Sequence, residues 1–244
     1  MKVFAIMPCY KTASTAPSIA KSLLDYVDMV ICVDDGCPQN SGHEIQSFIN
    51  SPRIKVLFHT QNRGVGAATK TGIRMALDLG AEIVVKVDSD GQMNISLIPK
   101  LIRPIIEARS DLCKGNRFNN INSILSMPFM RLIGNTALGF ITKLSTGYWE
   151  LFDPTNGFIA MPSETVKNIQ IDKTHNRFFF ETDLLFRCGL YDLIVTEVPM
   201  NSIYRSEKSN LNPFYEFFIY LFNNILIFIK RLFYQYFVLD FNPG

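Results

Sequence analysis

The sequence predicts an α/β fold, a mostly parallel sheet flanked by helices, on two observations. Short apolar runs and helical patterns alternate four times between residues 1 and 92, as they do when helices join parallel strands. Motifs rich in Asp, Gly and Pro follow these runs, at the strand ends where open α/β sheets bind ligands. The 244 residues suffice for one such domain with an appendage.

The overall composition bears on whether the protein binds nucleic acid and on which cellular compartment it occupies. Lys and Arg total 24 against 22 acids, a formal net charge of +2, so the charge balance does not indicate nucleic acid. The five cysteines form an odd, scattered set that fits a reducing compartment better than a disulfide framework or a zinc site. The apolar run 3–7 is too short for a signal peptide, and no run of about 20 apolar residues follows. We therefore expect a protein on the cytoplasmic side without a simple spanning helix.

Four strands are expected before residue 92, and polar motifs follow them. The strands are predicted at 3–7, 29–33, 55–59 and 83–87, with a helix around 17–24 after the first. The third is followed by a glycine loop that opens a helix with Ile73, Ala76 and Leu77 on one face. The carboxyl ends of parallel strands meet at one edge of a sheet, so the motifs should converge there. They include Pro8, Asp34, Asp35, Gly64, Gly66, Asp88 and Asp90.

The fourth strand is followed by Asp88-Ser89-Asp90-Gly91-Gln92, which predicts a metal site. Two carboxylates one residue apart at a strand end can turn toward one ion, and Gly91 allows the backbone to bend. Hard oxygen ligands suit Mg²⁺ or Mn²⁺, with water and substrate phosphate oxygens in the remaining positions. A plain surface turn uses the same residue types, so the neighbouring motifs must decide between the two.

The glycine loop also imitates a dinucleotide-binding fingerprint. Gly64 and Gly66 follow a strand, and Asp88 comes about 20 residues later. The third glycine is missing, because position 69 is Thr69, and the motif follows the third strand and not the first. The sequence therefore predicts only a helix amino terminus that offers N–H groups to a nucleotide or to the preceding loop.

The second half is less regular. Helices are expected at 96–108, where Pro104 should kink or end the helix, at 129–144 and at 178–190, with strands at 111–115 and 193–198. The turn-rich segment 145–158, which holds the only tryptophan, Trp149, suits a sugar-binding wall or an ordinary packed turn. The cationic loop 204–210 suits a diphosphate or plain solvent. The helix at 129–144 should bury one face that carries Met130, Ile133, Ala137, Phe140, Ile141 and Leu144.

The carboxyl-terminal segment 213–244 is predicted to be a unit separate from residues 1–212. Aromatic and aliphatic residues fill it, Asn223-Asn224 interrupt the apolar run and Lys230-Arg231 close it. Aromatics with flanking cations suit a helix that lies in the headgroup region of a membrane. The alternative is a hydrophobic helix that docks on the domain or forms a dimer.

The motifs, taken in order, resemble the inverting glycosyltransferases of family 2, which have the Rossmann-like GT-A fold. The resemblance is strongest to the branch of polyprenol-phosphate sugar transferases, with its dolichol-phosphate mannosyltransferases and bactoprenol glucosyltransferases. It covers nearly the whole chain, from Pro8 to about Asn242. The matching stretches are Pro8-Cys9-Tyr10, Asp34-Asp35-Gly36, 62–68, 88–92, Gly115-Asn116-Arg117, 153–158, Glu181-Thr182-Asp183, Tyr204 and Glu207-Lys208-Ser209.

The resemblance implies a hexosyltransferase that takes a sugar from a nucleotide-sugar donor, such as a UDP-sugar or GDP-mannose. It implies that a divalent ion held by Asp90 and Gln92, beside Asp88, neutralises the leaving diphosphate. It also implies that Pro8, Tyr10, Asp35, Gly66 and Asp88 line the nucleotide-sugar, and that the phosphate-binding residues are Arg117, Arg205 and Lys208. One departure is Cys37, where the family often has Ser after the glycine.

Asp183 stands where relatives with hydroxyl acceptors place a general base. A polyprenyl (undecaprenyl or dolichyl) phosphate is already a nucleophile at neutral pH, because the second pKa of a phosphate monoester is about 6. Asp183 would then position groups without taking a proton. Relatives often continue into spanning helices after such a carboxyl-terminal segment, so we expect this chain to bind the membrane surface, form a homo-oligomer or depend on a membrane-protein partner. Two alternatives stay open, a transferase acting on a glycan hydroxyl and a membrane-bound scaffold with a degenerate site.

Overall fold

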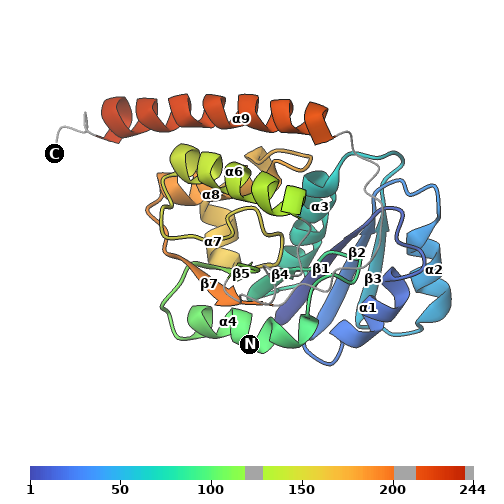
Figure 1. The fold of residues 1–244 in the computed structure, drawn as a ribbon. Coiled ribbons are helices and arrows are strands. Elements are labelled where there is room, and N and C mark those ends of the chain that lie inside the picture. Colours follow the sequence, from blue (N-terminus) through green and yellow to red (C-terminus); the bar gives the residue numbers. More distant parts are fainter. Residues whose placement is uncertain (119–128, 201–212, 240–244) are drawn as a thin grey trace.

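A seven-stranded sheet forms the centre of the protein. The computed structural model describes residues 1–118, 129–200 and 213–239 (Figure 1). The strand order is β3-β2-β1-β4-β6-β5-β7, and only β6 runs antiparallel to its neighbours. The strands are β1 (Val3–Cys9), β2 (Met29–Asp34), β3 (Ile54–Phe58), β4 (Ile83–Lys86), β5 (Leu112–Asn116), β6 (Ile159–Pro162) and β7 (Val195–Pro199).

Helices cover both faces of the sheet because the central strands are apolar on both sides. In β1, Ala5 and Met7 belong to one apolar cluster, whereas Phe4 and Ile6 belong to the other. The first cluster includes residues of α1 (Ala16–Leu23), α2 (Ser41–Phe48) and α4 (Ile98–Ile106). The second includes residues of α3 (Val65–Asp78), α7 (Ser163–Asn168) and α8 (Phe180–Leu190). This arrangement confirms the predicted α/β fold.

The register of the sheet places the strand ends at one edge. Cys9 of β1 pairs with Asp34 of β2, and Asp34 pairs in turn with Phe58 of β3. On the other side, Ile6 of β1 pairs with Lys86 of β4. The motifs that follow β1, β2, β3 and β4 therefore emerge side by side, as predicted.

A further layer lies outside α8. It consists of α9 (Pro213–Phe233), with a π-helical turn at Tyr234–Leu239, and α9 lies across both α8 and its neighbour α6 (Phe129–Thr146) (Figure 1). The prediction that the apolar face of α6 is buried is wrong, since the side chains of Ile133 and Phe140 are 48% and 58% exposed. The buried residues of α6 include Thr142, Ser145 and Thr146 instead, because the contact with α9 uses hydroxyl and amide groups.

Other differences are local. The antiparallel strand β6 and the short helices α2 and α7 were not predicted, whereas α4 continues through Pro104 to Ile106 before it ends. Two 3-10 turns, Ile95–Leu97 and Ile171–Lys173, complete the helical segments that are described. None of the described helices combines the length and apolarity needed to cross a membrane. The five cysteines are buried free thiols.

Candidate active site

The loop after β4 carries the predicted metal motif and is fixed to the loop after β1. The Ser89 hydroxyl donates to the carbonyl of Pro8 at 2.8 Å, and the Thr15 hydroxyl donates to the carbonyl of Ser89 at 2.7 Å. The main-chain N–H of Gln92 donates to Asp90 Oδ1 at 2.9 Å, which tightens the turn at Gly91. These bonds hold the 88–92 loop at the carboxyl edge of the sheet.

A buried lysine links this motif to α8. Lys86 Nζ lies 2.6 Å from Asp88 Oδ1 and 3.1 Å from Glu181 Oε1, and its side chain is almost inaccessible. Burial opposes the charge, but the two carboxylates outweigh burial and raise the pKa of Lys86 above its usual value. Gly157 leaves room for this contact, since a Cβ there would lie 2.6 Å from Lys86 Nζ. The first turn of α8 therefore lies beside the predicted metal motif.

The loop after β2 is held by its own carboxylates. Asp34 accepts main-chain hydrogen bonds from Cys37 and Gly42 at 2.7 and 2.6 Å. Asp35 is buried, and it accepts from the main chain of Gly64 at 2.7 Å and contacts His59 Nδ1 at 2.6 Å. Asp35 thus joins the loops after β2 and β3, two of the sites expected to line the nucleotide.

The amino terminus of α3 is packed against the segment before α8. A Cβ at Gly66 would lie 2.3 Å from the carbonyl oxygen of His175, so only glycine fits. The N–H of Ala67 donates to the carbonyl of Asn176 at 2.9 Å, so part of this helix terminus is satisfied by the chain itself. The role of Gly66 toward a nucleotide stays a prediction, and its close approach to main chain is what the structure adds.

Arg117 is engaged by a buried carboxylate. Its Nε and Nη2 donate to the two oxygens of Asp153 at 2.6 and 2.7 Å, a bidentate pair. Asp153 also accepts the main-chain N–H of Arg117, and Glu197 accepts that of Asp153. Close by, the fully buried Lys114 donates to the carbonyl of Pro154 at 2.8 Å, and burial lowers the pKa of Lys114 to about 8. The phosphate-binding role of Arg117 stays a prediction.

Asp183 faces the His175 loop from the first turn of α8. Its Oδ2 accepts the main-chain N–H of His175 at 2.7 Å, and Arg187 Nε lies 3.7 Å from Oδ1. Burial raises the pKa of Asp183, although Arg187 and the His175 hydrogen bond act in the opposite direction. A carboxylate with a raised pKa accepts a proton more readily, so the raised pKa of Asp183 suits a base as well as a positioning group.

The donor set fits a hard divalent ion with few protein ligands. Within the described ranges there is no group of three or more His, Cys, Asp or Glu placed to hold a metal. The predicted set of Asp88, Asp90 and Gln92 has only two acids, all its donors are oxygens, and Asp88 Oδ1 already contacts Lys86. Such a site leaves most coordination positions to phosphate oxygens and water, as Mg²⁺ and Mn²⁺ accept.

Some of the predicted site residues lie together in the structure, and others lie outside the residues that it describes. Pro8, Asp35, Asp88, Asp90 and Gln92 lie along the carboxyl edge, and half-exposed Tyr10 follows β1. Arg205 and Lys208 lie outside the described residues. Sequence reasoning missed Lys86, although a lysine inside an otherwise apolar strand was a signal that it needs a buried partner.

Comparison with known proteins assigns the family. The family model described as glycosyl transferase family 2 matches residues 4–169. A UDP-N-acetylglucosamine–dolichyl-phosphate N-acetylglucosaminyltransferase from Methanococcus voltae is 30% identical over 83% of this chain and 86% of its own. An undecaprenyl-phosphate mannosyltransferase from Micrococcus luteus is 27% identical over 84% of this chain and 85% of its own.

The fold has a counterpart among solved structures. The Mycobacterium tuberculosis glucosyl-3-phosphoglycerate synthase, solved with Mn²⁺, uridine diphosphate and phosphoglyceric acid, superimposes with a TM-score of 0.68. The match covers 94% of this chain and 78% of that one at 16% identity, which shows a shared fold alone. On the family match and the relatives, this chain belongs to glycosyl transferase family 2.

Proposed function

We propose that this glycosyltransferase moves a sugar from a nucleotide-sugar donor to a polyprenyl phosphate in a divalent-metal-dependent reaction. The observation that carries the proposal is the contact of the Asp88 motif, through Lys86, with the helix that bears Asp183. This contact supports one site, because the motif assigned to the donor lies beside the helix that carries the carboxylate assigned to the acceptor. The two relatives named for dolichyl and undecaprenyl phosphate support the acceptor class.

Each end of the donor has candidate partners in the chain. Asp90 and Gln92, beside Asp88, would hold a Mg²⁺ or Mn²⁺ ion. When bound, that ion supplies Lewis-acid stabilisation of the leaving diphosphate. Pro8, Tyr10, Asp35 and Gly66 are assigned to the nucleotide and its sugar. Lys86 keeps Asp88 in place by occupying Oδ1.

At the acceptor, the site must bind a phosphate group, and it needs a base only if the acceptor is a hydroxyl. Arg117, Arg205 and Lys208 are assigned to phosphate groups of donor or acceptor. A phosphate monoester is ionised at neutral pH and attacks the sugar carbon without a base, so Asp183 would position groups. The raised pKa of Asp183 favours one second candidate, transfer to a glycan hydroxyl with Asp183 as the base.

We also propose that the protein works at a membrane surface, on its cytoplasmic face. The α9 segment supports this, because Phe222, Ile225 and Ile229 are exposed on its outer side although they are apolar. The buried free thiols support a reducing compartment. A homo-oligomer or a membrane-protein partner would cover the same apolar face. Residues 1–212 then form the catalytic unit and 213–244 the membrane-associating unit.

The decisive experiment supplies the purified protein with UDP-glucose, UDP-N-acetylglucosamine or GDP-mannose and either a polyprenyl phosphate or a hydroxyl acceptor. We expect lipid-linked sugar from one donor, and loss of product when a chelator removes divalent ions. Asp90→Asn should lower the rate about 100-fold or more, as expected when transition-state charge stabilisation is removed. Asp25→Asn, an exposed carboxylate after α1, is the matched control.

Asp183→Asn separates the two acceptor classes. We expect it to spare most of the rate with a phosphate acceptor and to reduce the rate with a hydroxyl acceptor by about 100-fold or more. Total loss with the phosphate acceptor would contradict the positioning role. Transfer to neither acceptor class, in the presence of metal and every donor, would contradict the proposed function as a whole.

A further inference from the structure

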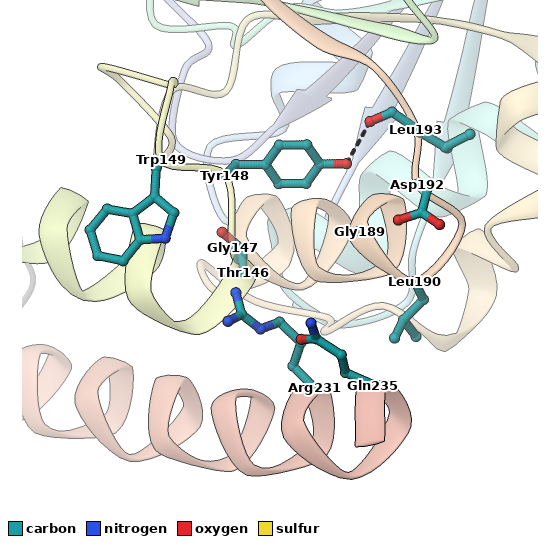
Figure 2. Close-up of a pocket in the computed structure, with 10 residues that line it drawn as sticks. All are labelled: Thr146, Gly147, Tyr148, Trp149, Gly189, Leu190, Asp192, Leu193, Arg231 and Gln235. Atoms are coloured by element: carbon teal, nitrogen blue, oxygen red, sulfur yellow. Dashed lines mark hydrogen bonds between the residues drawn. The ribbon is translucent and has the colours of Figure 1, made fainter. Parts of the chain in front are cut away.

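A pocket lies at the end of α8 opposite to the candidate active site. The carboxyl ends of α6 and α8 and the last turn of α9 line it, and it is partly open to solvent, with a volume of about 440 Å³ (Figure 2). Asp183 is in the first turn of α8 whereas Gly189 and Leu190 of the pocket are in its last, roughly 10 Å apart along the helix. The pocket is therefore a separate site. Its wall is formed by Thr146, Gly147, Tyr148, Trp149, Gly189, Leu190, Asp192, Leu193, Arg231 and Gln235.

Arg231 of α9 enters this pocket with an unsatisfied donor. Its Nε is buried and has no hydrogen-bond partner, a state shared only with Arg187 Nε among the side chains that the structure describes. Gly147 makes room for the guanidinium, since a Cβ there would lie 2.3 Å from Nη1. A cation at the carboxyl ends of α6 and α8 is favoured by the helix dipoles, but dipoles leave Nε without an acceptor. The Arg231 guanidinium, a planar group of the kind that binds phosphate oxygens, therefore lines this pocket.

The opposite charge on the wall restricts what kind of anion fits. Asp192 lines the same pocket from the turn after α8, at a different part of the wall from Arg231 (Figure 2). Its φ of 49° lies in the left-handed region, where Asp and Asn are tolerated better than most residues. A bare phosphate would be repelled by this carboxylate, whereas a phosphate that carries an ammonium group nearby would match both charges.

On the proposed membrane surface, the pocket would lie at the level of lipid headgroups. The outer side of α9 exposes Phe222, Ile225 and Ile229, which would enter the acyl boundary of a bilayer, and Arg231 is on the docked side. A helix is about 10 Å across, so its docked side then lies near the phosphate level. Trp149 is half-exposed beside the pocket, and Trp at this depth is typical of membrane interfaces.

We infer that this pocket binds the headgroup of a zwitterionic phospholipid, with the phosphate at Arg231 and the ammonium at Asp192. The inference rests on the proposed membrane surface. It adds a lipid-recognition site that is distinct from the donor and acceptor sites and that fixes how α9 sits on the bilayer. The apolar face gives adhesion to any bilayer, and the pocket gives a preference among headgroups.

Vesicle binding of the full chain tests the charges of Arg231 and Asp192 one at a time. On phosphatidylethanolamine–phosphatidylcholine vesicles, Arg231→Gln and Asp192→Asn should each weaken binding about 5-fold or more, the loss of one charge-assisted hydrogen bond. On phosphatidylglycerol vesicles, Arg231→Gln should again weaken binding, but Asp192→Asn should strengthen it because a repulsive carboxylate is gone. Lys230→Gln, the neighbouring exposed cation, should weaken binding only to the anionic vesicles. The sign change at Asp192 is specific to a zwitterionic ligand.

A soluble headgroup separates this inference from the membrane proposal. Glycerophosphoethanolamine should shift the NMR amide signals of Gly147 and Gly189, whereas inorganic phosphate at the same concentration should shift them less. If the protein bound no vesicles but kept these shifts, only the membrane proposal would fail. The headgroup inference would be overturned if Arg231→Gln and Lys230→Gln had equal effects on both vesicle types. It would also be overturned if inorganic phosphate bound as well as glycerophosphoethanolamine. Arg231→Lys, which keeps the charge but loses the fork, serves if Arg231→Gln does not fold.

Discussion

The carboxyl edge of the sheet and the contact between α6 and α9 both bury polar groups, but they satisfy them differently. At the sheet edge, charges meet opposite charges or main-chain donors, as with Lys86 between Asp88 and Glu181. Between α6 and α9, neutral groups meet neutral groups, as with Ser145 and Asn224 at 2.5 Å. Breaking a buried charge pair leaves an uncompensated charge, whereas breaking a neutral pair costs about one hydrogen bond.

This difference assigns the two regions different mechanical roles. The charged contacts hold three loops and α8 in one arrangement, which a site that positions a diphosphate requires. The neutral contacts hold α9 against the body more weakly, and the outer side of α9 remains apolar and exposed. A weakly held helix can adjust to a membrane surface without disturbing the site. Four experiments, from the largest expected effect to the smallest, test this contrast.

Lys86→Met should be the most destabilising change. It removes the only ion-pair partner that the structure gives Glu181 within the described residues, and it leaves two carboxylates facing each other. We expect a loss of about 3 kcal/mol in the free energy of unfolding, measured by urea denaturation at pH 7. The deficit should shrink in acid, where the carboxylates are protonated.

The control for this change is Lys55→Met, on the exposed face of β3. It should alter stability by no more than about 0.5 kcal/mol, because an exposed lysine loses little when truncated. A similar small effect at Lys86 would mean that the charged network does not hold the site together.

Lys114→Met should change the pH dependence of stability. Burial lowers the pKa of Lys114 to about 8 in the folded chain, from 10.5, so the unfolded chain binds more protons between these values. Stability therefore rises with pH across this window in the wild type, and this contribution disappears in the variant. The difference in unfolding free energy between wild type and variant should increase by about 2 kcal/mol from pH 7.5 to 9.5. A constant difference would show that Lys114 stays fully charged when buried.

The comparison also explains what the sequence could predict. Six of the seven strands and the longer helices were predictable because apolar runs and turn residues are local signals. The convergence of Pro8, Asp35 and Asp88 followed from the parallel topology. The second partner of Lys86, Glu181, was not predictable, since it is distant in the sequence and only packing brings it close. Strand β6 was missed because four residues after a turn-rich loop carry too little periodicity.

The same reasoning explains the error at α6. Its spacing of Ile133, Phe140 and Leu144 is the pattern of a buried face, yet these side chains are exposed. Periodicity reports that a face is apolar, not what covers it. On α6 and α9 the apolar sides remain on the surface, while Thr142 and Ser145 make the contact. For a protein at a membrane, an apolar face predicts contact with lipid as readily as contact with protein.

Ser145→Ala and Asn224→Ala should reveal the weaker contact. In a double-mutant cycle we expect a coupling of about 1 kcal/mol between them, typical of one neutral hydrogen bond. Hydrogen exchange of the α9 amides should accelerate in both single variants, while the sheet amides stay protected. Thr136→Ala combined with Asn224→Ala is the matched control and should give no coupling, because Thr136 is exposed on α6 and bonds its own helix. A coupling energy near 3 kcal/mol would show that the α6–α9 contact is as strong as the charged contacts at the sheet edge.

Phe222→Ser should have the smallest effect on stability and a large one on membrane binding. Phe222 is 61% exposed on the outer side of α9, so the free energy of unfolding should change by at most about 0.5 kcal/mol. Vesicle binding should weaken about tenfold or more, since a phenylalanine side chain transferred from water contributes roughly 1.5–3 kcal/mol. Ile227→Ser on the docked side should instead lower the free energy of unfolding and leave vesicle binding nearly unchanged. Ile227 is 5% exposed and packs with Phe179 and Phe186. If Phe222→Ser instead weakened self-association and left vesicle binding intact, a second copy of the chain would cover this face.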